Sequence, residues 1–165
     1  MLAITSQLER DAAVLAVERH GAQLYGAVPY TVHLADVRRL LASFHWTGSL
    51  LVAAWLHDVL EDTDTTREEL RDRFGAEVEG LVWTVSGFGT NRKARNADAW
   101  TKVAAYGQDA ATLKLADRVA NVSSARSTRP DLFRMYQREQ GQFRAAICPL
   151  GDGALWELLD ELLRA

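Results

Sequence analysis

Apolar side chains recur every three to four residues along most of the chain, which is the period of a helix packed on one face. No segment shows the sustained alternation or the richness in β-branched residues that favours a strand. The pattern therefore predicts an all-α protein. The expected helices and buried helical faces cover residues 6–20, 33–44, 50–60, 66–74, 78–85, 97–106, 110–126, 130–147 and 154–163.

Helix-start signals and one long loop complete the pattern. A capping box, in which a hydroxyl accepts a hydrogen bond from a first-turn N–H, is expected at Ser6 and at either Thr65 or Thr66, since each lies three residues before a glutamate. The stretch SGFGTNRKARN, residues 86–96, is the longest loop that the pattern predicts. Its basic side chains at positions 92–95 either close over a polyphosphate or are merely solvated.

The composition is that of a soluble globular protein. With 165 residues, 48% of them apolar and 25% charged, the chain can bury one sizeable core but is short for two. We therefore expect a single domain over residues 1–165. The net charge of −3 gives no whole-chain electrostatic reason to bind nucleic acid or an anionic membrane.

The cysteine count and the lengths of the apolar stretches bear on where the protein is located. The single cysteine, Cys148, excludes an internal disulfide and is expected to pack in the core. The longest apolar stretch, residues 50–56, is too short to span a membrane, and the N-terminus meets charge too early for a signal peptide. These features predict a cytoplasmic protein.

One polar stripe interrupts an apolar helix in the segment WLHDVLEDTDTT, residues 55–66. On a helix that turns about 100° per residue, Asp58, Glu61 and Asp62 lie at about 100°, 40° and 140° from His57, opposite the apolar face. These acidic side chains therefore do not belong to the core. Taken alone, the run favours a solvated helix end.

A second polar stripe lies in LKLADRVANVSS, residues 113–124. Lys114, Asn121 and Ser124 lie at about 60°, 40° and −20° from Asp117, on a helix otherwise built from Leu, Ala and Val. Two such stripes, on helices that each need a buried face, indicate that they face each other across a pocket.

A divalent cation would explain why His57, Asp58 and Asp117 tolerate partial burial, because its charge offsets the carboxylates while the imidazole supplies a nitrogen ligand. His33, which follows a rigid Pro-Tyr turn, is the natural fourth ligand. The chain has four histidines, so only two remain, too few for a second metal of a histidine-rich binuclear site. One metal is therefore favoured.

The order His33, His57-Asp58, Asp117 resembles that of HD-type phosphohydrolases, named for their adjacent His-Asp pair. More narrowly, the chain is similar to the hydrolase domain of the RelA/SpoT family and to its small stand-alone members. The matching stretches, in family order, are HGAQLYGAVPYTVH (20–33), AAWLHDVLEDTDTT (53–66), FGAEVEGLV (74–82) and LKLADRVAN (113–121).

The resemblance implies a single-domain HD-type helical bundle with a central mononuclear metal site. It implies removal of the 3′-pyrophosphate from (p)ppGpp by a divalent metal, expected to be Mn²⁺, although Fe²⁺, Co²⁺ or Zn²⁺ suits the same ligands. The implied roles are metal binding for His33, His57, Asp58 and Asp117, catalysis for Glu61 and Asp62, and nucleotide contact for Asn121 and Ser124.

Two further side chains are candidates for substrate binding. Lys114 either reaches a substrate phosphate or the acidic pair, or lies on the surface. Tyr25 either stacks on a base or packs under the turn. Tyr25 stands where the family reads His-x-Gly-Gln-x-Arg, in a segment one residue shorter here, and Ser123-Ser124 replaces the Arg-Thr pair that usually follows Asn121.

We therefore expect a hydrolase of (p)ppGpp or a close analogue. The synthetase domain of the long family members is absent from the sequence, so hydrolysis alone is expected. The departures keep open another substrate, such as the 2′-phosphate of NADPH or an adenine alarmone, and a non-catalytic nucleotide-sensing or antitoxin-like module. A leucine face over residues 155–162 is expected to close the core, with a homodimer seam as the alternative.

Overall fold

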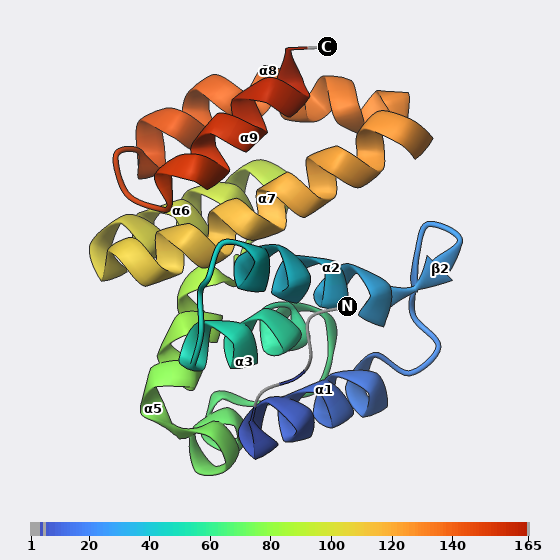
Figure 1. Cartoon of the computed structure of the whole chain (residues 1–165), viewed down its shortest axis with the longest axis vertical. Helices are drawn as coiled ribbons and strands as arrows, with labels where there is room; N and C mark the ends of the chain where they lie inside the picture. The colour runs from blue at the N-terminus through green and yellow to red at the C-terminus, as the bar shows by residue number, and fades with distance from the viewer. Residues whose placement is uncertain (1–3, 5, 165) are drawn as a thin grey trace.

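Helices follow one another along almost all of the described chain, which is residue 4 and residues 6–164 of a computed structural model (Figure 1). The all-α class is confirmed. The helices are α1 (Gln7–His20), α2 (Tyr30–Ser43), α3 (Ser49–Leu56), α4 (Val59–Asp62), α5 (Arg67–Val85), α6 (Arg92–Tyr106), α7 (Gln108–Thr128), α8 (Pro130–Ile147) and α9 (Gly153–Leu163). Between α1 and α2, strands β1 (Leu24–Tyr25) and β2 (Val28–Pro29) form a short antiparallel hairpin that the periodicity did not predict.

Side-chain caps fix several helix starts. The Ser6 hydroxyl accepts a hydrogen bond from the Glu9 N–H at 3.1 Å, as the sequence predicts. Of the two threonine alternatives, Thr66 is the cap of α5, because its hydroxyl accepts from the Glu69 N–H at 3.2 Å. Helix α2 begins at Tyr30, three residues earlier than predicted, directly after Pro29. Side-chain caps therefore begin α1 and α5, whereas α2 begins after a proline without a side-chain cap.

Helix α7 runs through the middle of the molecule and organises the other helices around it (Figure 1). It packs against α2, α3 and α5 on one side and against α6, α8 and α9 on the other. Helix α1 lies beyond α3 and contacts it along its length. The two predicted polar stripes, at the end of α3 and in α7, thus come from neighbouring elements.

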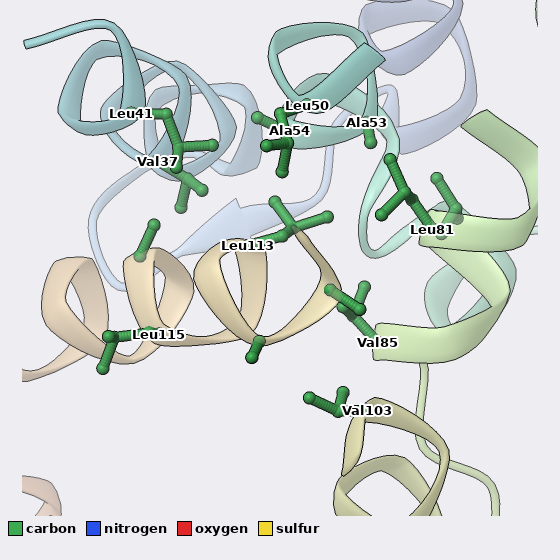
Figure 2. Packing of buried hydrophobic residues seen from close by; sticks show 14 of the residues in the cluster. Val37, Leu41, Leu50, Ala53, Ala54, Leu81, Val85, Val103, Leu113 and Leu115 are labelled. Atoms are coloured by element: carbon green, nitrogen blue, oxygen red, sulfur yellow. The ribbon is translucent and has the colours of Figure 1, made fainter. Parts of the chain in front are cut away.

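The apolar core fills the space between these helices. Leu113 of α7 points towards Leu50 and Ala54 of α3, while Leu115 extends from another side of α7 (Figure 2). Leu155 and Leu159 of α9 are fully buried, as expected for a helix that closes the core. The prediction that Cys148 packs in the core is wrong: it lies exposed just beyond the end of α8. No helix among the described residues is both long and apolar enough to span a membrane.

Two predicted boundaries are wrong in ways that matter for the site. The helix expected over residues 50–60 is broken, because α3 ends at Leu56 and α4 begins at Val59, leaving His57 and Asp58 in a turn. The loop expected over residues 86–96 is shorter, because the Asn91 side chain caps α6 by accepting a hydrogen bond from the Ala94 N–H at 3.0 Å. The basic residues at positions 92–95 therefore lie on the first turn of α6.

Candidate metal centre and active site

Four side chains with metal-ligand chemistry converge from three parts of the chain. His33 comes from α2, His57 and Asp58 from the turn after α3, and Asp117 from α7. His33 Nε2 lies 3.3 Å from Asp117 Oδ1 and 3.7 Å from Asp58 Oδ2. His57 Nε2 lies 2.9 Å from Asp58 Oδ2 and 3.7 Å from Asp117 Oδ1. The structure thus brings together all four side chains predicted as ligands.

Neighbouring groups orient these four side chains. The His57 Nδ1–H donates to the carbonyl oxygen of Ala54 at 2.9 Å, which directs Nε2 towards the two carboxylates. The Tyr30 hydroxyl donates to Asp58 Oδ2 at 2.7 Å. Because a carbonyl oxygen can only accept, the tautomer of His57 at Nδ1 is fixed. These contacts are of the kind that hold a ligand in one direction before a cation binds.

A second chain of contacts reaches Asp117 from the hairpin. The Asn121 amide donates to Asp117 Oδ1, and its carbonyl oxygen accepts from the Tyr25 hydroxyl at 2.6 Å. The Tyr25 ring also stacks on His33, with ring centroids 4.7 Å apart and planes 11° apart. Burial raises the pKa of Tyr25, so its hydroxyl stays protonated and remains a donor. Tyr25 therefore touches one proposed ligand and reaches another through Asn121.

The electrostatics of the cluster favour a positive charge at its centre. Burial of His57 lowers its pKa, but the carboxylates of Asp58 and Asp117 outweigh this and raise the pKa well above its ordinary value. The buried His57 Nε2 has no hydrogen bond of proper geometry among the described residues. Two imidazoles and two carboxylates, with one ring nitrogen left without a hydrogen bond among the described residues, fit a divalent transition-metal ion.

The acidic pair after the turn lies on the same cavity. Glu61 Oε1 accepts a hydrogen bond from the Gly87 N–H at 2.8 Å, and Asp62 Oδ2 accepts from the Gln23 amide at 3.0 Å. Burial raises the pKa of Glu61, although the charge of Lys114 acts in the opposite direction. A carboxylate with a raised pKa is suited to accept a proton near neutral pH.

Glycine is required at position 87 for that contact. A side-chain Cβ there would lie 2.5 Å from the backbone oxygen of Arg95, which real Cβ atoms do not tolerate. The close approach lets the loop before α6 present its N–H to Glu61. The sequence showed that this loop contains glycines, but not that the N–H of one of them donates a hydrogen bond to Glu61.

Lys114 lies inside the site and not on the surface. Its ammonium group is 3.3 Å from Asp117 Oδ2, and the side chain lines the cavity. Burial lowers its pKa, but Asp117, Glu61 and Asp58 outweigh burial and raise it. Lys114 therefore carries a fixed positive charge beside the proposed ligands.

These groups share one cavity of about 350 Å³. The predicted site residues that line it are His33, Asp58, Glu61, Asp62, Lys114, Asp117 and Asn121. His57 is buried behind this wall. Tyr25 and Ser124, predicted as substrate contacts, do not line the cavity; Ser124 lies beside the Tyr25 hydroxyl. The hairpin turns Tyr25 onto His33, so it is not free to stack on a base.

Sequence reasoning missed much of the opposite wall. The cavity extends to residues of α6, α7 and α8, namely Arg92, Arg95, Asn96, Ala99, Trp100, Arg118, Tyr136 and Phe143. Only Arg92 and Arg95 had a signal, the positive charge of the predicted loop. The others sit at ordinary helical positions, where nothing in the local pattern distinguishes a cavity wall from a core.

Comparison with known proteins decides the family. The sequence model of the HD domain matches residues 12–143. This chain belongs to the HD domain family. An HD domain together with the cluster of His33, His57 and Asp58 indicates a site for a divalent metal ion.

Relatives of this HD domain carry names from one group of enzymes. It is 35% identical over 153 residues to a guanosine-3′,5′-bis(diphosphate) 3′-pyrophosphohydrolase of Aquifex aeolicus, over 89% of this chain and 22% of that protein. It is 38% identical over 138 residues to the protein of the same name from Vibrio cholerae, over 79% of this chain and 20% of that protein. The HD domain thus spans about a fifth of the length of these curated relatives.

Solved structures agree on the fold. One, described as a metazoan ortholog of SpoT that hydrolyses ppGpp, superposes with a TM-score of 0.85 at 26% identity, covering 99% of this chain and 97% of that chain. A protein of Listeria monocytogenes matches with a TM-score of 0.62 at 24% identity, over 83% of this chain and 97% of that chain, which shows the fold alone. The resemblance of this HD domain to RelA/SpoT hydrolase domains is confirmed.

Proposed function

We propose that this HD domain is a metal-dependent phosphohydrolase that removes the 3′-pyrophosphate of (p)ppGpp or of a close analogue. The observation that carries the proposal is the placement of Glu61 beside the His-Asp cluster, on the wall of one cavity. The printed activity of the relatives and of the metazoan neighbour supports the choice of substrate. The proposal concerns only this HD domain, which is much shorter than the curated relatives.

His33, His57, Asp58 and Asp117 would hold the cation, which we propose to be Mn²⁺ because mixed imidazole and carboxylate ligands suit it. A divalent cation supplies Lewis-acid chemistry, polarising a phosphoryl group and lowering the pKa of water. Tyr30 and Asn121 keep the two carboxylates directed at the cluster.

Glu61 is proposed as the group that takes the proton from the attacking water. The Gly87 N–H occupies Oε1, and within the described residues no hydrogen bond reaches Oε2, which can therefore accept that proton. Its raised pKa brings it closer to the working pH. Lys114, which carries a fixed charge beside Asp117, is positioned to neutralise a phosphoryl oxygen. Asp62, held by Gln23, completes the acidic pair.

We propose different roles for the residues predicted to bind the substrate. Asn121 lines the cavity, but both its amide groups already have partners. We propose that Tyr25 and Ser124 act behind Asn121, with Tyr25 bracing Asn121 and His33. The hairpin therefore offers tyrosine where the family places a basic side chain. This specific difference favours a second candidate, an HD phosphohydrolase of another phosphorylated nucleotide such as NADPH or an adenine alarmone.

A release assay with purified protein and Mn²⁺ tests the proposal. Pyrophosphate and orthophosphate would be measured with ppGpp, pppGpp, an adenine alarmone and NADPH side by side. Release of pyrophosphate from the guanine alarmones, with loss on chelation, is the expected result. Orthophosphate from NADPH alone would select the second candidate. Binding of nucleotides without any release would instead identify a non-catalytic sensing or antitoxin-like module.

A further inference from the structure

The wall of the cavity opposite the acidic pair has the reverse chemistry. We call it the arginine wall, formed by Arg92, Asn96 and Trp100 of α6, Arg118 of α7 and Tyr136 of α8. Nothing in the proposed hydrolysis uses these side chains. Three separate helices contribute them, so the wall is a feature of the tertiary structure and not of a local motif.

Two cations on this wall share one carboxylate. Arg92 donates to both oxygens of Glu139, at 2.7 and 3.0 Å, and Arg118 Nη1 donates to Glu139 Oε2 at 3.0 Å. Within the described part of the chain, no second carboxylate forms an ion pair with either arginine. The cluster therefore keeps one positive charge that no protein carboxylate balances.

Arg118 is unusual because it is buried and, among the described residues, only part of its guanidinium group has a hydrogen-bond partner. It is only 6% exposed, and its Nε and one Nη have no hydrogen-bond partner within the described residues. Its guanidinium lies 4.7 Å from the Tyr136 ring centroid and 4.8 Å from that of Phe143. Buried N–H groups without partners destabilise a fold, so a purely structural cluster is a poor explanation.

We propose that Arg92 and Arg118 form an anion subsite, which binds a phosphate group of the nucleotide other than the one released. The inference rests on the proposed function, because it assumes that one phosphorylated end of the substrate lies at the acidic side. The substrate of the proposed function is phosphorylated at two separate positions, so the subsite would hold the end that is not cleaved. The corresponding product, a nucleoside 5′-diphosphate, should occupy the subsite by itself.

The geometry explains why the second phosphate binds here. The acidic side carries Asp58, Glu61, Asp62 and Asp117, which repel any anion that a cation does not hold. Arginine forks match phosphate oxygens through paired N–H donors, and Arg92 lies partly exposed at the cavity. A phosphate at this wall would compete with Glu139 for the same guanidinium groups. Removing an arginine should therefore weaken phosphate binding, whereas removing the Glu139 carboxylate should strengthen it.

The test is GDP binding by isothermal titration calorimetry, with guanosine as the uncharged comparison and the full chain in Mn²⁺ buffer. Arg92→Gln should weaken GDP binding about 10-fold or more, since it removes a charge-assisted contact, and leave guanosine binding unchanged. Glu139→Gln should tighten GDP binding several-fold, because it removes the competing carboxylate. Arg138→Gln is the matched control, an exposed arginine of α8 outside the cavity, and should change neither.

Three outcomes overturn the inference: no measurable binding of GDP to the wild-type chain, no effect of Arg92→Gln, or weaker binding in Glu139→Gln. Arg92→Lys, which keeps the charge and loses the fork, should give an intermediate affinity and serves if Arg92→Gln does not fold. GDP binding can be measured without turnover, so an absence of hydrolysis would contradict the proposed function alone. Hydrolysis together with GDP binding that is unchanged in Arg92→Gln would contradict only the anion subsite.

Discussion

The two sides of the cavity differ in how their charges are satisfied. On the acidic side, each carboxylate has a named donor: Tyr30 for Asp58, Gly87 for Glu61, Gln23 for Asp62 and Asn121 for Asp117. On the arginine wall, two guanidinium groups share the single carboxylate of Glu139. The carboxylates of the acidic side are thus fixed in direction. The arginine wall, by contrast, keeps one positive charge that no carboxylate of the described residues balances.

The difference shows what each side is built to receive. Carboxylates held by fixed donors keep their direction, which suits a cation and a proton transfer that need fixed distances. Cations that outnumber their carboxylate present a net positive charge, which suits a mobile anionic group of a ligand. One cavity therefore offers complementary sites for the two ends of a doubly phosphorylated molecule.

The largest effect is expected where the acidic side loses a ligand. Asp117→Ala or His57→Ala should lower metal affinity by more than about 100-fold, because even changes behind the ligands cost about 10- to 100-fold. Pyrophosphate release should fall to background with it. Elemental analysis of the dialysed protein and the release assay measure the two effects. Asp131→Ala, an exposed acidic residue of α8, is the control. A variant that keeps both metal and turnover would exclude these side chains as ligands.

A smaller loss of activity is expected when the cation site is kept and only the proposed proton acceptor is removed. Glu61→Gln keeps the size of the side chain and its contact with the Gly87 N–H, so metal binding should be unchanged. Turnover should fall about 100-fold or more, the usual contribution of a positioned general base. The control is Glu77→Gln, an exposed residue of α5. Full activity in Glu61→Gln would assign the proton transfer to another group, with Asp62 the next to test.

A still smaller effect should follow from loosening the brace behind the ligands. Tyr25→Phe keeps the ring on His33 and removes the 2.6 Å hydrogen bond to Asn121. We expect Mn²⁺ affinity to fall by up to about 10-fold, the lower range for groups that orient a ligand. Tyr25→Ala, which removes both contacts, should lose more. Titration calorimetry with Mn²⁺ measures both, with the exposed Tyr106→Phe as control. Equal affinities in wild type and Tyr25→Ala would show that the brace is only structural.

The sequence predicted the acidic side far better than the arginine wall, for a physical reason. His57, Asp58, Glu61 and Asp62 lie within one short stretch, and a polar stripe on an apolar helix has a period that the sequence displays. The break of the helix at His57 was not foreseen, because nothing in the local propensities marks a turn there. The residues converge all the same, since α3, α2 and α7 pack side by side.

The arginine wall could not be read in this way. Arg118 stands between apolar positions of α7, and Tyr136 and Glu139 lie on α8 at spacings typical of any amphipathic helix. Their meeting depends on how α6, α7 and α8 cross, which side-chain packing decides. The position of Tyr25 has the same origin: the hairpin that turns it onto His33 consists of two-residue strands, too short to leave a periodic signal.

The smallest effect should separate the arginine wall from an ordinary ion-pair cluster. Burial raises the pKa of Glu139, but Arg92 and Arg118 outweigh burial and lower it below its ordinary value of 4.5. Its ionised form therefore stabilises the fold above about pH 4.5, and this contribution is lost as the pH falls through the lowered value. Glu139→Gln should lower the free energy of unfolding by about 1 kcal/mol at pH 7, as for a partly exposed pair.

Urea denaturation at pH 7 and at pH 3 measures that difference, which should shrink at the lower pH, and Glu157→Gln on the exposed side of α9 should show none. A difference that stays constant with pH would mean that the carboxylate does not titrate with the fold. A cluster built for stability would lose both stability and ligand affinity in Glu139→Gln. An anion subsite should lose stability while binding GDP more tightly, because the carboxylate that stabilises the empty wall is the one that a phosphate must displace.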